Sequence, residues 1–186
     1  MITFAPVENR KLSNIELGRI RPDEYASLPE SGVVVVLDNV RSAYNVGSIF
    51  RTCDAFKIDR LYLCGICAFP PSAEIHKTAL GAELSVPWEH VPDTLALAER
   101  LKAQGYILLG VEQTSCSLPL QDFVPEQGKK YALVFGNEVD GVRQDVIDAA
   151  DATLEIPQFG SKHSLNVAVS AGVVLWHMTF CHWHGH

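Results

Sequence analysis

Apolar residues recur along the chain in short continuous runs, separated by stretches with helical spacing of apolar positions. Residues 33–37 read Val-Val-Val-Val-Leu, a β-branched run typical of a strand that is covered on both faces. Similar runs occupy residues 61–64, 106–111, 131–135 and 152–156. Because helical patterns lie between these runs, we expect an α/β domain with a mostly parallel sheet and helices on both faces.

Four helices are predicted, over residues 45–57, 92–104, 143–150 and 164–180. The first carries one apolar stripe, and the second begins with Pro-Asp and is followed by glycine. The last helix is apolar on nearly every face, so it needs cover on two sides. The sheet provides one cover. A second copy of the protein is expected to provide the other, because a two-fold dimer is the commonest oligomer; burial within one chain is the alternative.

Length and composition limit the class of protein. The 186 residues with 47% hydrophobic content suit a single domain, which we place at residues 32–186 after a polar N-terminal arm over residues 1–31. No apolar run is long enough for a signal peptide or a membrane span, so a cytoplasmic protein without membrane contact is expected. The formal net charge of −7 argues against a uniformly basic nucleic-acid binder.

The charges are unevenly distributed along the chain. Residues 1–60 hold eight Lys+Arg and eight Asp+Glu, whereas residues 61–186 hold seven and fourteen. The acidic excess therefore lies wholly in the second part, and a local basic face with salt-sensitive affinity for a nucleic acid is compatible with the first part. The basic residues expected to contribute from the arm are Arg10, Lys11, Arg19 and Arg21.

The five cysteines are odd in number and scattered, unlike the disulfide framework of a secreted protein. Cys64 and Cys67 have CxxC spacing, but no second pair follows at the distance of a zinc ribbon. We interpret them as buried structural thiols rather than a metal or redox site. The C-terminal histidines are interpreted as part of a frayed tail, and no metal site is expected. These histidines are His177, His182, His184 and His186.

Polar clusters follow three of the predicted strands, and ligands of open α/β sheets bind outside the carboxyl ends of the strands. In the first cluster Asn45 is expected to cap the following helix. Gly47 and Arg51 share one face of that helix, where the glycine would leave room for a substrate above the guanidinium. The alternative for Arg51 is a surface ion pair with Asp54.

The second and third clusters flank the later strands. Gly136 follows a buried strand and lets a ligand approach the bare backbone, and Glu138 lies in the turn after it. In the third cluster Ser164 is the expected N-cap of the apolar helix. Asn166 lies in the first turn of that helix, where its amide needs a partner if it is buried.

Several common enzyme signatures are absent from the sequence. It contains neither GxGxxG nor GxxxxGK[ST], which removes most support for dinucleotide or triphosphate chemistry, and it has no GxSxG elbow. The three clusters instead resemble, in wording and order, the three motifs of the SpoU (TrmH) family of RNA 2′-O-ribose methyltransferases in the SPOUT superfamily. The motifs read LDNVRSAYNVGSIFRTCDAF, LVFGNEVDGV and LEIPQFGSKHSLNVAVSAG, and the resemblance extends over roughly residues 32–180.

The resemblance implies a deep trefoil knot in the C-terminal third and S-adenosyl-L-methionine as the methyl donor for a ribose 2′-hydroxyl of tRNA or rRNA. Arg51 would act as general base, or as a charged group that holds a phosphate or stabilises the alkoxide. The implied catalytic residues are Asn45, Arg51, Glu138, Ser164 and Asn166. The implied cofactor-binding residues are Gly136, Ile156, Leu165 and Val111.

Two other hypotheses for the function stay open at this point. One is a non-catalytic RNA-binding protein that keeps the fold without turnover. The other is an α/β transferase for small molecules that shares only the polar loops at the strand ends. A non-catalytic RNA-binding protein is distinguished from a methyltransferase by its failure to bind S-adenosylmethionine. A small-molecule transferase is distinguished by its failure to transfer a methyl group to bulk RNA.

Overall fold

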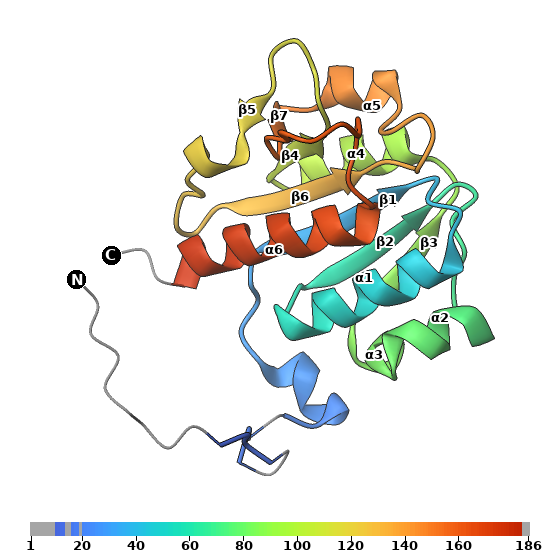
Figure 1. The fold of residues 1–186 in the computed structure, drawn as a ribbon, viewed down its shortest axis with the longest axis vertical. Coiled ribbons are helices and arrows are strands. Elements are labelled where there is room, and N and C mark those ends of the chain that lie inside the picture. The colour runs from blue at the N-terminus through green and yellow to red at the C-terminus, as the bar shows by residue number, and fades with distance from the viewer. Residues whose placement is uncertain (1–9, 14–15, 19, 184–186) are drawn as a thin grey trace.

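The fold is a three-layer α/β arrangement, seen in a computed structural model that describes residues 10–13, 16–18 and 20–183 (Figure 1). The strands are β1 (Val33–Asp38), β2 (Arg60–Cys64), β3 (Trp88–Val91), β4 (Tyr106–Val111), β5 (Leu118–Pro119), β6 (Lys130–Phe135) and β7 (Ala152–Glu155). The α-helices are α1 (Ala43–Ala55), α2 (Ala73–Ala79), α3 (Ala82–Ser85), α4 (Thr94–Ala103), α5 (Gln144–Ala149) and α6 (Val167–Trp183), and the 3-10 helices are η1 (Pro22–Ser27) and η2 (Leu120–Asp122).

All seven strands join one parallel sheet in the order β3-β2-β1-β6-β4-β7-β5. The β-branched run forms β1 at its centre, where alternate side chains enter opposite cores. Val35 belongs to the core that contains side chains of α1, α2 and α6, and Val36 belongs to the core that contains side chains of α4 and α5. Helices α1 and α6 cover one face of the sheet, and α4 and α5 cover the other (Figure 1). The expected parallel sheet with helices on both faces is confirmed. The trefoil knot stays a prediction.

Two neighbouring central strands lead to opposite faces of the sheet. The chain leaves β1 through α1 on one face and leaves β6 through α5 on the other, and the two strands are paired from Val33 with Tyr131 to Leu37 with Phe135. This is a topological switch point, where the loops after two adjacent strands separate and leave a crevice. The starts of α1 and α6 lie at this same edge of the sheet (Figure 1).

The start of α1 differs from the prediction. The N-cap is Ser42, whose side chain accepts a hydrogen bond from the Asn45 backbone N at 3.3 Å. Asn45 therefore lies inside the first turn, and its assignment as the cap is wrong. Because Ser42 already satisfies this end of the helix, the Asn45 side chain is released for other contacts.

Helix α6 buries only one side. Val174, Leu175 and Met178 enter the core beneath the sheet, whereas Val169 and Trp176 on the other side are 52% and 53% exposed. The alternative of a helix wholly buried within one chain is therefore wrong. The imidazole Nε2 of His177 lies 2.6 Å from the Phe123 carbonyl oxygen, so this residue belongs to the packed helix rather than to a frayed tail.

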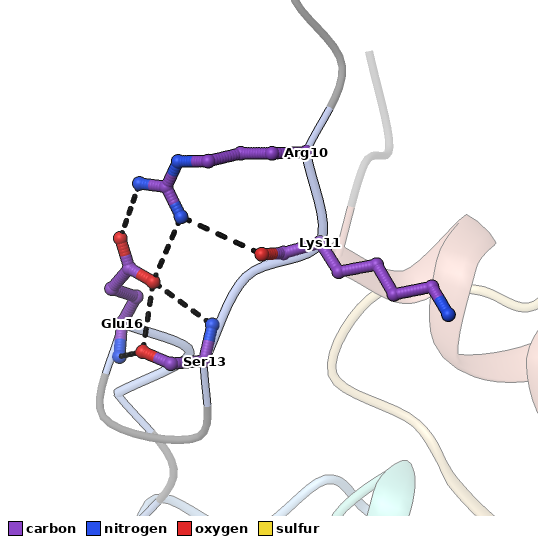
Figure 2. A network of polar contacts seen from close by, with 4 residues as sticks. All are labelled: Arg10, Lys11, Ser13 and Glu16. Atoms are coloured by element: carbon purple, nitrogen blue, oxygen red, sulfur yellow. Dashed lines mark hydrogen bonds and ion pairs between the residues drawn. The ribbon is translucent and has the colours of Figure 1, made fainter.

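The stretch predicted as an arm joins the domain at Tyr25 of η1. This ring is buried, and its hydroxyl donates to the Ile58 carbonyl at 3.0 Å. Farther upstream, Figure 2 shows the Arg10 guanidinium donating to both carboxylate oxygens of Glu16, at 2.6 and 3.1 Å. These bonds, with those from Ser13, lower the pKa of Glu16 to about 2, so Glu16 offsets the charge of Arg10 at neutral pH. Arg19 lies outside the described residues.

The cysteines of the CxxC pair are buried at the end of β2 and in the following turn. The Cys67 thiol donates to the Leu37 carbonyl and accepts from the Val40 backbone N. Burial raises the pKa of both Cys64 and Cys67 to about 12, which keeps them protonated and unreactive. None of the helices in the described part of the chain has the length and hydropathy needed to cross a membrane.

Candidate active site

Three polar side chains from the three sequence clusters meet at the carboxyl edge of the sheet. The Asn45 amide nitrogen on α1 donates to Glu138 Oε1 at 2.8 Å. The Asn166 amide nitrogen donates to Asn45 Oδ1 at 3.2 Å. Residues 93 and 121 positions apart are thus joined by hydrogen bonds. Asn45 uses its donor and acceptor on different partners, so its amide is held in one orientation.

Asn166 also determines where α6 begins. Its Oδ1 accepts from the Ala168 backbone N at 2.9 Å and from the Val169 backbone N at 3.4 Å, which is the geometry of an N-cap. Ser164 was predicted to be this cap, and that prediction is wrong because the helix starts three residues later, at Val167. One amide group of Asn166 therefore caps the helix with its oxygen and fixes Asn45 with its nitrogen.

A cavity of about 510 Å³ opens beside this hydrogen-bonded chain. It lies at the carboxyl ends of β4, β6 and β7, and Glu138 and Asn166 are among its walls. All four predicted cofactor-binding residues line it, as does Ser164. Its size is typical of sites for small molecules, and its mixture of apolar and polar walls is typical as well. The apolar walls include Val111, Ile156 and Leu165, and the backbone of Gly136 lies bare at the end of β6.

The loop after β6 is folded tightly against the strand end. A Cβ on Gly136 would lie 1.9 Å from the Gly141 carbonyl carbon and 2.1 Å from the Val142 nitrogen, so no larger residue fits. Asn137 stabilises the loop, since its Oδ1 accepts from the backbone N of Val139 and Asp140, each at 2.9 Å. The Gly136 backbone, which was predicted to be open to a ligand, thus packs against Gly141 and Val142 of its own loop and also faces the cavity.

Two carboxylates that the sequence analysis did not single out anchor this loop. The fully buried Asp38 accepts from the Arg143 backbone N at 2.9 Å and from the Thr94 hydroxyl at 2.6 Å. Glu112, a wall of the cavity, accepts from the Val142 backbone N at 3.1 Å. Both follow directly on apolar strand runs. An acidic residue at such a strand end was the signal that could have identified them.

Arg51 is not brought into contact with the other predicted catalytic residues. Arg51 lies exposed on α1, and its guanidinium has no hydrogen-bond or ion-pair partner among the described residues. The alternative ion pair with Asp54 is therefore not formed. Gly47 is buried against α2, where a Cβ would lie 2.4 Å from the Ile75 carbonyl oxygen. The expectation that Gly47 leaves room for a substrate is wrong, because that space is filled by α2.

Comparison with known proteins gives consistent matches. The SpoU rRNA Methylase family matches residues 32–176. A 23S rRNA (guanosine-2′-O-)-methyltransferase of Neisseria meningitidis is 31% identical over 82% of this chain, which spans 60% of that protein's length. A tRNA (guanosine(18)-2′-O)-methyltransferase of Aquifex aeolicus is 30% identical over 79% of this chain and 68% of its own.

Solved structures show the same fold. The TrmH/SpoU tRNA modifying enzyme of A. aeolicus superposes with a TM-score of 0.77 and 27% identity, covering 88% of this chain and 82% of its own. The SpoU methyltransferase AviRb of Streptomyces viridochromogenes, in complex with the cofactor AdoMet, gives 0.74 and 25%, covering 84% and 63%. Since the family match extends over most of the domain and includes all three polar clusters, the chain belongs to the SpoU rRNA Methylase family.

Proposed function

We propose that the protein transfers a methyl group from S-adenosylmethionine to a ribose 2′-hydroxyl of tRNA or rRNA. One observation carries the proposal. Asn45, Glu138 and Asn166, each from a different family motif, are joined by hydrogen bonds, and two of them form part of the cavity wall. A hydrolase or nucleotide-binding site would need other groups, whereas methyl transfer needs orientation of two reactants and the removal of one proton.

The cavity suits the proposed cofactor in size and in charge. Its walls carry the carboxylates of Glu112, Glu138 and Glu155, which complement the positive charges of a sulfonium and an amino group. The apolar side chains of Val111, Ile156 and Leu165 suit an adenine ring. When bound, the cofactor supplies a methyl group that is already activated for transfer. The protein therefore has to hold the ribose and stabilise charge on its oxygen.

Two residues of α1 are assigned these tasks in the proposal. Asn45 is held rigidly by Glu138 and Asn166, and a fixed amide orients a sugar hydroxyl without an entropic penalty at the moment of reaction. Arg51 lies about 9 Å farther along the helix axis, six residues on at about 1.5 Å each. Its exposed and unpaired guanidinium is available to a backbone phosphate or to the developing alkoxide.

The proposal is tested by incubating the protein with methyl-labelled S-adenosylmethionine and separate tRNA and rRNA fractions. We expect label that survives alkaline hydrolysis and is recovered, after nuclease digestion, in a 2′-O-methylnucleoside. Arg51→Ala should bind the cofactor with unchanged affinity in calorimetry and lose transfer. Label on a base would refute the ribose assignment. Absence of cofactor binding by the unmodified protein would favour the non-catalytic RNA-binding alternative.

We also propose that the protein is a dimer that buries the outer side of α6. Val169, Val173 and Trp176 recur there at helical spacing and are exposed, and the Trp176 ring stacks on Phe180 with centroids 5.0 Å apart. A contiguous apolar stripe of this kind is uncommon on a monomer surface. Two such stripes are self-complementary across a two-fold axis.

Sedimentation tests this assembly. The protein should sediment as a dimer at micromolar concentration, and Trp176→Glu should convert it to a monomer that remains folded. Leu84→Glu is the matched control, because Leu84 is also exposed but belongs to α3, which packs against α1, α2 and η1. A monomer of the unmodified protein would refute the proposal, as would loss of the dimer in the control variant.

A further inference from the structure

The outer face of α1 carries an exposed aromatic ring beside the proposed site. Tyr44 directly precedes Asn45 and is 46% exposed. Tyr44, Ser48 and Arg51 follow one another at intervals of four and three residues, so they share one face of the helix. The Tyr44 ring thus lies about two helical turns from Arg51, on the same surface.

A cation from a second helix is held over this ring. Lys77 Nζ of α2 lies 5.8 Å from the centre of the Tyr44 ring. The two helices are fixed together there, since the Thr78 hydroxyl donates to the Tyr44 carbonyl at 3.0 Å and α2 fills the space over Gly47. The ring and its cation therefore form a preorganised pair on one rigid surface.

Other tyrosines of this protein also lie beneath cations, but their positions differ. The rings of Tyr25 and Tyr62 are buried. Tyr106, with Lys130 Nζ at 5.5 Å, stands at the first residue of β4, which is the opposite edge of the sheet from the proposed site. Among the described residues, Tyr44 is the ring beneath a cation that is both exposed and next to the site.

The positive charges around Tyr44 are not offset by ion pairs. Arg41 just before α1, Lys77 and Arg51 make no hydrogen bond or ion pair with side chains of the described residues. Glu74 lies one helical turn before Lys77 and does not pair with it. On a chain with a formal net charge of −7, a surface that carries the unpaired cations of Lys77 and Arg51 beside an exposed aromatic ring is complementary to a polyanion with stacking bases.

We propose that Tyr44 and Lys77 bind a single-stranded segment of the RNA substrate next to the reacting ribose. A base stacks on Tyr44, and Lys77 contacts the adjoining phosphate. This inference rests on the proposed function and names the RNA contact of the same site. Stacking on an aromatic ring is tolerant of sequence, and an unpaired strand can present its bases in this way whereas a duplex cannot.

Binding to two probes separates stacking from phosphate contact. The probes are a fluorescent oligoadenylate of about 10 nucleotides and an abasic phosphodiester strand of the same length. Tyr44→Ala should weaken oligoadenylate binding by about 5-fold to 100-fold and leave abasic binding unchanged, whereas Tyr44→Phe should match the unmodified protein. Lys77→Gln should weaken both and lower the slope of log affinity against log salt by about 1. Tyr106→Ala, the matched control, should change neither.

The outcomes distinguish this inference from the proposed function. Equal oligoadenylate affinity in Tyr44→Ala and the unmodified protein overturns the inference, as does a lack of oligoadenylate binding by the unmodified protein. A shift in sedimentation of Tyr44→Ala without an affinity change also overturns it, and places the ring between copies of the chain. The methyl-transfer assay is scored separately. RNA methylation with an unchanged KM in Tyr44→Ala refutes the inference alone, and no methylation by the unmodified protein refutes the function.

Discussion

Replacing Gly136 by alanine tests how the loop after β6 is held against the sheet. The added Cβ would lie 1.9 Å from the Gly141 carbonyl carbon, and an ordinary contact begins at 3.4 Å, so the loop must move by about 1.5 Å. The atoms in the way belong to the backbone, so a change of side-chain rotamer cannot relieve the overlap. We therefore expect Gly136→Ala to displace residues 141–143.

The energetic effect follows from the bonds that this displacement breaks. The backbone N of Val142 donates to Glu112 at 3.1 Å, and that of Arg143 donates to the buried Asp38 at 2.9 Å. Hydrogen bonds to charged groups contribute about 1.5–3 kcal/mol each, so losing both destabilises the fold by about 3–6 kcal/mol. The same movement shifts the wall of the cavity, so we also expect cofactor affinity to fall.

Urea unfolding followed by circular dichroism measures the free energy of unfolding, and calorimetry measures S-adenosylmethionine binding. Gly160→Ala is the matched control, because Gly160 lies in the loop before α6 and a Cβ there meets no heavy atom within 4 Å. The control should unfold within about 0.5 kcal/mol of the unmodified protein. If Gly136→Ala were equally stable and bound the cofactor equally well, the loop would not be anchored as described.

Three further predictions concern other parts of the chain. Asn45→Asp places a carboxylate against Glu138 in place of a donor, so methyl transfer should fall by about 10-fold to 100-fold although the Ser42 cap is intact; unchanged activity would contradict this. Burial acts to raise the pKa of Asp151, but hydrogen bonds from Lys102 and the Leu108 N outweigh it and hold the pKa below its usual 3.8. The ionised Asp151 therefore stabilises the fold above pH 3.8, and this stabilisation is lost as the pH falls through the lowered pKa. Asp151→Asn should lower the free energy of unfolding by about 1 kcal/mol at pH 7 and differ little from the unmodified protein in unfolding curves measured below the lowered pKa. A difference that stays constant across pH would argue against this account. Iodoacetamide at pH 7 should label the exposed Cys116 and spare the buried Cys67 in peptide mapping of the native protein, and rapid labelling of Cys67 would contradict its burial.

The helices and strands that are packed between other layers were predicted from the sequence, because their burial gives a clear apolar pattern. The apolar runs at residues 33–37 and 106–111 both became strands, and helix α1 begins within two residues of its prediction. Strand β3 was missed because it is an edge strand whose four residues are all only partly buried, so it lacks a continuous apolar run. Strand β5 has only two residues, too few for a pattern.

The site was predicted in part. Motif order identified Asn45, Glu138 and Asn166, which the structure brings together, because each lies near the end of a strand or the start of a helix whose pattern was visible. The roles of individual residues depended on packing that the pattern does not contain. Gly47 was misinterpreted because α2, which covers it, was not predicted, and Asp38 was overlooked because its partners lie 56 and 105 residues away.

The walls of the cavity come from three separated stretches of chain, around residues 111–113, 135–141 and 154–170. No continuous fragment that ends before α6 contains all three. The cavity therefore forms only after helix α6 has docked, and during synthesis it cannot exist until Ser170 has left the ribosome. A ligand that binds there stabilises only the completed fold, by about 2.7 kcal/mol at a concentration one hundred times its Kd. The free energy that keeps α6 docked on the sheet therefore rises with the concentration of the ligand.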